Sequence, residues 1–126
     1  MRGEVAEVRM EKQTPHNVLH IDGTTARRQA SGPDGQSGRL VYWDVLSSSE
    51  RYTCLVAVGV GTADQAEVRV VRFSGCDTSA PTDAWRVERV EGRLNIVSLP
   101  SRSPLEDASL ERVLRSIVTE ELRRLR

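Results

Sequence analysis

Apolar and polar side chains alternate through most of the stretch from Arg39 to Leu99, and valine is the most frequent apolar residue. A period of two is typical of β-strands, because successive side chains point to opposite faces of a sheet. Short segments rich in Gly, Ser and Asp interrupt the alternation. The pattern therefore predicts an antiparallel sheet whose strands are joined mainly by hairpins.

The lengths of these interruptions set the expected register of three hairpins. They turn at residues 47–50, at residues 61–65 and at Glu91-Gly92. A slip of one residue would turn every side chain of a strand to the other face, so consistent faces in successive hairpins support one register. The expected pairs are Val41 with Val56, Trp43 with Cys54, Val45 with Tyr52, Val60 with Ala66, Val58 with Val68, Val56 with Val70, Val87 with Ile96, Trp85 with Ser98 and Arg89 with Leu94.

The end of the chain has a different period. Residues 104–126 carry apolar side chains at intervals of three and four, which predicts an amphipathic helix. Ser103 is the expected N-cap, with Glu106 completing a capping box and Pro104 in the first turn. The apolar stripe consists of Leu110, Val113, Leu114, Ile117, Val118, Leu122 and Leu125. Glu120 and Arg124 are expected on the opposite, polar face, and Glu121 interrupts the heptad pattern that a coiled coil would need.

One helix covers only one face of a sheet, and here both faces carry apolar side chains. The second set consists of Leu40, Tyr42, Leu46, Leu55, Val71 and Phe73. Residues 4–10 and 17–21 are expected to form two further short strands. We predict an α+β fold in which an antiparallel sheet of about five to seven strands is packed by one long C-terminal amphipathic helix. A strongly curved or barrel-like sheet is one form that this fold can take.

The chain of 126 residues is expected to form a single domain, residues 1–126. It would be strand-rich over 1–99, with a long flexible loop at 22–38 and the helix at 104–126. Basic and acidic residues number 18 each, which argues against nucleic-acid binding. Neither a signal peptide nor an apolar run long enough for a membrane helix is apparent, so a cytoplasmic location without membrane association is expected.

Two groups of residues before Arg39 are candidates for ligand chemistry. His16, His20 and Asp22 have side chains that zinc accepts, although the glutamate of the zincin motif is absent. Surface histidines without metal are the alternative. Arg27 and Arg28 could bind an anion from within the predicted loop, or they could simply be solvated.

A third candidate site uses Trp43, Tyr52, Arg72 and Trp85, which would line a pocket between the curved sheet and the helix. Arg72 lies on a face otherwise made of Val and Cys, so it must find an anion, an acidic partner such as Asp44 or Asp77, or the sheet edge. A bound anion would favour ligand binding, and a simple salt bridge would favour an interaction module.

No catalytic residues can be assigned, because the serines lack the context of a nucleophile elbow and the glycine pattern near Val58 lacks a third glycine. Cys54 and Cys76 are expected as free thiols, since the hairpin register places them too far apart for a disulfide.

We expect a non-enzymatic protein-interaction module without a cofactor. It would form a homodimer through an apolar sheet face, or bind another protein there or through the loop. The alternative is a small-ligand-binding protein with a pocket between sheet and helix. An enzyme using His20 with Asp22 or Asp44 is a third hypothesis.

Overall fold

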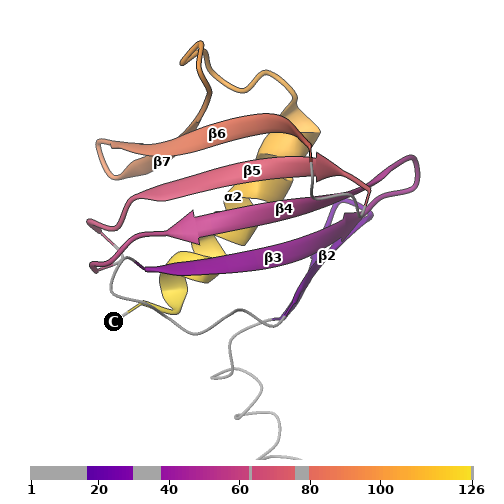
Figure 1. Ribbon diagram of the computed structural model, residues 1–126, viewed down its shortest axis with the longest axis horizontal. Helices are drawn as coiled ribbons and strands as arrows, with labels where there is room; N and C mark the ends of the chain where they lie inside the picture. The colour runs from indigo at the N-terminus through magenta and orange to yellow at the C-terminus, as the bar shows by residue number, and fades with distance from the viewer. Residues whose placement is uncertain (1–16, 30–37, 63, 76–79, 126) are drawn as a thin grey trace, which may run out of the picture.

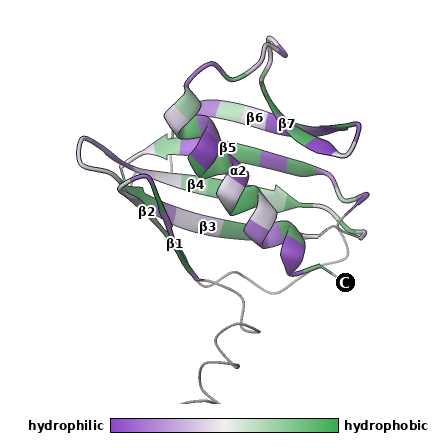
Figure 2. Cartoon of the chain, turned by 180° about the vertical axis from the view of Figure 1, so that it is seen from behind, coloured by the Kyte–Doolittle hydropathy of each residue, from purple (hydrophilic) through white to green (hydrophobic). Residues whose placement is uncertain are grey.

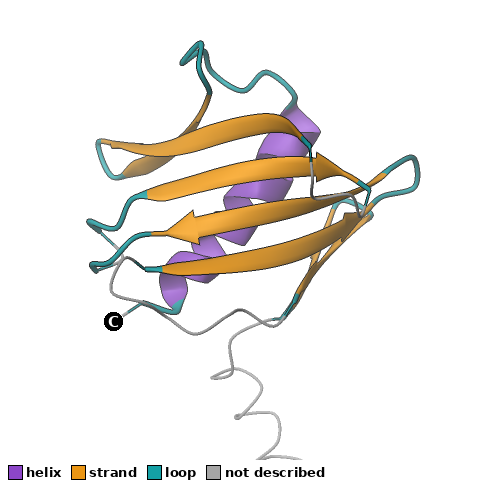
Figure 3. Ribbon diagram, viewed as in Figure 1, coloured by secondary structure: helices purple, strands orange, loops and turns teal. Residues whose placement is uncertain are grey.

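The computed structural model describes residues 17–29, 38–62, 64–75 and 80–125. They form seven strands followed by one helix. Figure 1 and Figure 3 show how the sheet and the helix are arranged. The elements are β1 (Val18–Ile21), β2 (Thr24–Arg28), β3 (Arg39–Leu46), β4 (Arg51–Val58), β5 (Val68–Ser74), β6 (Pro81–Val90), β7 (Arg93–Ser98) and α2 (Ala108–Arg123). The α+β architecture predicted from the sequence is confirmed.

The seven strands form one antiparallel sheet in which each strand pairs with the next along the chain, in the order β1 to β7. The register predicted from the loop lengths is confirmed for the pairs that fall within strands. Trp43 lies opposite Cys54, and Val58 lies opposite Val68. The last hairpin places Val87 opposite Ile96. The predicted pair of Val60 and Ala66 lies beyond the ends of β4 and β5.

The sheet curls into a half-barrel, and α2 lies across its inner face (Figure 2). The inward side chains alternate along each strand, as in Val41, Trp43 and Val45 of β3, which are fully buried. From the helix, Leu114 and Ile117 are also fully buried and belong to the same core cluster. The inner face and the helix thus share one hydrophobic core.

Polar contacts join α2 to both ends of the sheet. Arg112 forms an ion pair with Asp22 in the turn between β1 and β2. Arg115 donates a hydrogen bond to the main-chain carbonyl of Leu94 in β7. Because β1 and β7 are the two edge strands, the helix ties both edges to itself and occupies part of the hydrogen-bonding capacity of β7.

The predicted loop at 22–38 is wrong for Thr24–Arg28, which forms strand β2. This strand pairs with both β1 and β3, with Ala26 opposite Val45. The segment Thr-Thr-Ala-Arg-Arg lacks apolar alternation, so its strand conformation comes from the edge of β3 that it covers rather than from its own pattern. The other expected strand, residues 4–10, and the rest of that loop at 30–37 lie outside the described residues.

The predicted start of the helix is also wrong. Asp107, not Ser103, is the N-cap, and its carboxylate accepts a hydrogen bond from the amide of Leu110 at 3.1 Å. The segment after β7 instead folds back against that strand. The amide of Ser98 donates a hydrogen bond to the carbonyl of Ser103, and the amide of Leu105 donates one to the carbonyl of Ile96. The helix ends at Arg123 and not at residue 126.

Replacing the N-cap tests this revised boundary. Asp107→Ala should lower the free energy of unfolding by about 1 kcal/mol, because the amide of Leu110 loses its side-chain acceptor and the helix dipole loses a negative charge. Ser103→Ala, the matched control, should change it much less. Urea unfolding monitored by circular dichroism measures both. A larger loss in the Ser103 variant would place the cap where the sequence alone suggested.

Candidate functional site

A buried carboxylate lies where β2, β3 and α2 meet. The side chain of Glu121 is fully buried and accepts hydrogen bonds from three residues on the sheet. Arg28 donates through Nε at 2.7 Å, Arg39 through Nη2 at 3.2 Å and the Trp43 indole through Nε1 at 2.9 Å. Arg39 also donates to the main-chain carbonyl of Glu121 at 2.8 Å. We call Arg28, Arg39, Trp43 and Glu121 the Glu121 cluster.

The sheet register explains how these donors converge. Arg28 pairs with Trp43 across β2 and β3, and Arg39 and Trp43 are both inward residues of β3. A buried carboxylate is costly without partners, and hydrogen bonds from charged donors offset that cost. Since Glu121 is enclosed, the cluster is arranged to hold the C-terminal half of α2 on the sheet rather than to react with a substrate.

Three of the four predicted pocket residues come together in a second group. The Arg72 guanidinium lies 5.1 Å from the ring centre of Tyr52 and 5.6 Å from that of Trp85. Its Nε and Nη2 both donate to one carboxylate oxygen of Asp83, at 2.9 and 2.5 Å. Trp43, the fourth predicted residue, belongs to the Glu121 cluster instead.

The acidic partner of Arg72 is therefore neither of the two residues expected from the sequence. Asp44 accepts a hydrogen bond from Gln29 at 2.7 Å, and Asp77 lies outside the described residues. Asp83 lies directly opposite Arg72 across β5 and β6. The salt bridge is the arrangement that favours an interaction module over an anion site.

Burial changes the acid–base properties of two side chains in this region. It raises the pKa of Tyr52, with the nearby Cys54 thiol adding to the shift and the Arg72 cation opposing it. It also raises the pKa of Cys54 from 9.0 to about 12, again against the effect of Arg72. Cys54 is free and buried, as predicted, and is therefore a neutral and poorly reactive thiol.

The structure separates the two adjacent arginines that were predicted as an anion site. Arg28 points inward to Glu121, whereas Arg27 is exposed on the other face of β2. The sequence predicted that Arg28 would bind an anion from outside the chain. In the structure the anion that it contacts is the carboxylate of Glu121. The two side chains do not form one site, because neighbours on a strand face opposite ways.

The predicted metal ligands are only partly described. His20 is exposed, with Nδ1 3.5 Å from the Thr25 hydroxyl, and Asp22 is paired with Arg112. His16 lies outside the described residues. Within the described ranges, no group of three or more His, Cys, Asp and Glu side chains is arranged to hold a metal ion.

The outer face of the sheet, opposite α2, carries exposed apolar side chains. Leu40 is 58% exposed, Leu46 is 56% exposed and Tyr42 is 38% exposed, all on β3. The register continues this surface across the sheet, because Tyr42 pairs with Leu55 and Leu55 pairs with Val71. We call these five residues the outer patch. Phe73, predicted as a sixth member, is only 7% exposed.

Comparison with known proteins gives no relative, since no family model, curated protein or solved structure matches the chain. In the described part of the chain, no helix is both long and apolar enough to cross a membrane. The functional argument therefore depends on the geometry of the clusters and the outer patch.

The Glu121 cluster is the feature that sequence reasoning missed. The prediction that Glu120 lies on the polar face of the helix is also wrong. Its side chain is only 3% exposed, and it forms ion pairs with Arg123 and Arg124. One signal was present in the sequence. Glu121 occupies an apolar-stripe position, and Arg39 occupies an inward position of the predicted strand. Two opposite charges at inward positions of separate elements indicate a buried pair.

Glu121→Ala should lower the free energy of unfolding by about 3–5 kcal/mol, because it leaves two largely buried guanidinium groups without their carboxylate. Glu121→Gln should cost less, since the amide oxygen still accepts a hydrogen bond. Glu111→Ala, which removes an exposed helix pair with Arg115, should cost no more than about 0.5 kcal/mol. Urea titration followed by tryptophan fluorescence ranks the three, and equal losses at Glu111 and Glu121 would contradict this role.

The raised pKa of Cys54 predicts loss of stability in base. Above pH 9 the thiol ionises in the unfolded chain, while the folded thiol stays neutral up to about pH 12. The free energy of unfolding should therefore fall as pH rises across this interval. Cys54→Ala should make the fall shallower, with Tyr52 supplying the remainder. Urea midpoints measured at several alkaline pH values test this, and an identical pH slope in the variant would refute the assignment.

Proposed function

We propose that this protein is an interaction module that forms a homodimer by packing the outer face of its sheet against the same face of a second copy. The observation that carries the proposal is the outer patch. Leu40 and Leu46, near the two ends of β3, each expose more than half of their surface. Between them the row from Tyr42 through Leu55 to Val71 crosses three strands.

The two faces of the sheet differ in how much of their apolar surface the chain itself buries. On the inner face α2 buries every inward side chain of β3 from Val41 to Val45. In the described structure no element covers the outer patch in the same way (Figure 1). Burying such apolar area is worth about 25 cal/mol per Å², so a second sheet packed there would be stabilising.

A second copy suits this surface better than a strongly charged partner. The patch residues are uncharged, and the charges beside them have both signs. Asp44 lies on the same face between Tyr42 and Leu46, and Arg69 and Arg86 lie on the row that begins at Leu40. A twofold interface must be self-complementary, which an apolar surface with neighbouring charges of both signs permits.

The alternative of a ligand pocket between sheet and helix has less support at the residues first expected to line it. Trp43 is fully buried, and Trp85 is only 3% exposed. Arg72 already has a carboxylate partner in Asp83. The side chains that would have contacted a ligand contact the protein itself.

Charged substitutions in the outer patch test the proposal. Leu40→Lys and Leu46→Lys should each convert a dimer to a monomer, because each would place a charge without a partner in an apolar contact. Val90→Lys is the matched control, since Val90 is 47% exposed at the far end of β6. Sedimentation velocity measures the oligomeric state.

The wild-type chain and the Val90 variant should sediment as dimers, and circular dichroism should show that all the variants fold. A monomeric wild-type protein at high concentration would overturn the proposal. So would dimers that persist in both leucine variants, which would place the interface elsewhere.

A further inference from the structure

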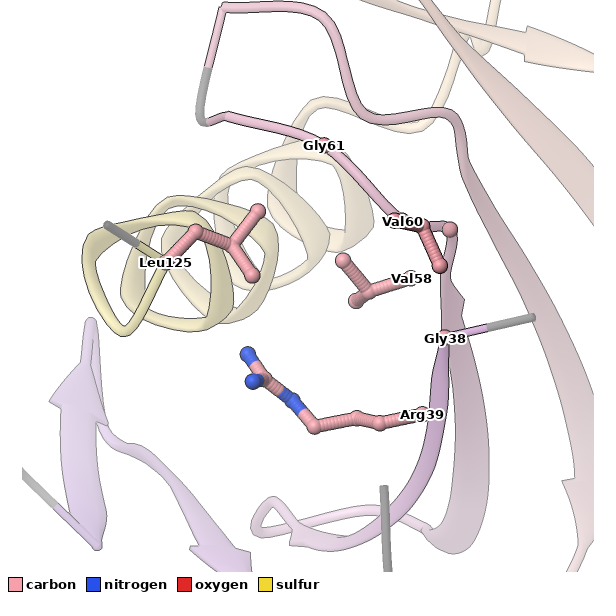
Figure 4. Close-up of a pocket in the computed structure, with 7 residues that line it drawn as sticks. Gly38, Arg39, Val58, Val60, Gly61 and Leu125 are labelled. Carbon is pink, nitrogen blue, oxygen red and sulfur yellow. The ribbon is translucent and has the colours of Figure 1, made fainter. Parts of the chain in front are cut away.

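A pocket of about 180 Å³ opens at the end of the half-barrel beside the C-terminal end of α2 (Figure 4). Its wall combines apolar side chains, glycine main chain and one charged group. Val58, Val60 and Leu125 supply the apolar side chains, and the Arg39 side chain extends into the pocket, with its guanidinium on the side of Val58 and Leu125. The three glycines are Gly38, Gly59 and Gly61.

The glycines determine the form of this wall. A Cβ on Gly38 would lie 2.0 Å from the carbonyl oxygen of Val58, and Gly38 has φ of +112°. No other residue type is tolerated there without displacing the backbone. Because glycine main chain forms part of the lining, a ligand can approach closely at this end of the sheet.

Arg39 is the charged residue among those that line the pocket, and 11% of its side chain is exposed. No carboxylate is among the lining residues of the described structure. An anionic ligand here would therefore meet a cation without facing a carboxylate on the pocket wall.

The hydrogen bonds of Arg39 are also incomplete. Its Nη2 donates to two oxygens of Glu121, but its Nε is buried without a hydrogen-bond partner among the described residues. This Nε is enclosed by the protein, so a ligand would not reach it. The Nη1 group forms no hydrogen bond with the described residues and is the donor that a ligand would meet.

We propose that this pocket binds a carboxylate carried on a short aliphatic chain. The carboxylate would lie at the Arg39 guanidinium, and the aliphatic part would contact Val58, Val60 and Leu125. The volume equals roughly six water molecules in the liquid, which suits a ligand with only a few carbon atoms. A free fatty acid and the C-terminal residue of a peptide both present this chemistry. The site lies at the end of the sheet and does not depend on the proposed dimer.

Titration of the ¹⁵N-labelled full chain with hexanoate tests the site by NMR. The amides of Gly38, Gly59 and Gly61 should shift in a saturable way, with Kd on the order of 1 mM for so small a ligand. Hexanamide, which has the same chain without the charge, should bind at least tenfold more weakly. N-acetyl-leucine compared with N-acetyl-leucinamide forms the peptide arm, and the tighter carboxylate of the two arms identifies the source.

A rim substitution separates specific binding from general attraction. Val60 is 67% exposed, so Val60→Asp should leave the fold unchanged while weakening hexanoate binding about three- to tenfold by like-charge repulsion. Val90→Asp introduces the same charge at a remote exposed valine and should leave Kd unchanged.

Three results would overturn the proposal: no shift of the glycine amides with either carboxylate, equal binding of hexanoate and hexanamide, or equal effects of the two aspartate variants. None of these readouts depends on whether the protein is a dimer, so this inference and the proposed function fail independently.

Discussion

The enclosed carboxylate of Glu121 determines how the helix sits on the sheet. It joins Arg28 of β2 and both Arg39 and Trp43 of β3 to the last full turn of α2. Rotating the helix by one residue turns its side chains by about 100° and would carry the carboxylate away from all three donors. Hydrophobic burial alone tolerates small rotations, because one leucine can replace another in the core. The charged contacts do not, so they select one orientation among several that bury similar apolar area.

With the helix fixed in this way, the inner surface of the sheet is complete. The N-terminal part of α2 is tied through Arg112 to the β1–β2 turn and through Arg115 to β7, on opposite edges of the sheet. A helix held at both edges cannot also cover the outer patch. Leu40, Tyr42 and Leu46 on that face of β3 therefore stay exposed in the described structure.

Sequence reasoning succeeded where a structural feature depends on short-range geometry. The hairpin registers followed from loop lengths and alternation, which is why Trp43 opposite Cys54 and Val87 opposite Ile96 could be predicted. It failed where a distant segment decides the outcome. Residues 24–28 become a strand because β3 offers them an edge, and Ser103 loses the N-cap to Asp107 because residues 98–105 pair with β7. The residues around each segment give no sign of the strand that it will contact.

The same distinction explains the sites. Tyr52 and Arg72 could be placed close together from the predicted hairpin of β4 and β5. The positions of Trp85 and Asp83 beside Arg72 depend on the pairing of β5 with β6, which a longer connection joins. Most arginines that face a second element prove to be paired with carboxylates of the chain itself, as Arg28, Arg72 and Arg112 are. An arginine-rich chain of balanced charge thus uses much of its cationic capacity internally. The described structure leaves apolar side chains exposed on the outer face, and at the end of the half-barrel the Arg39 guanidinium lines a pocket.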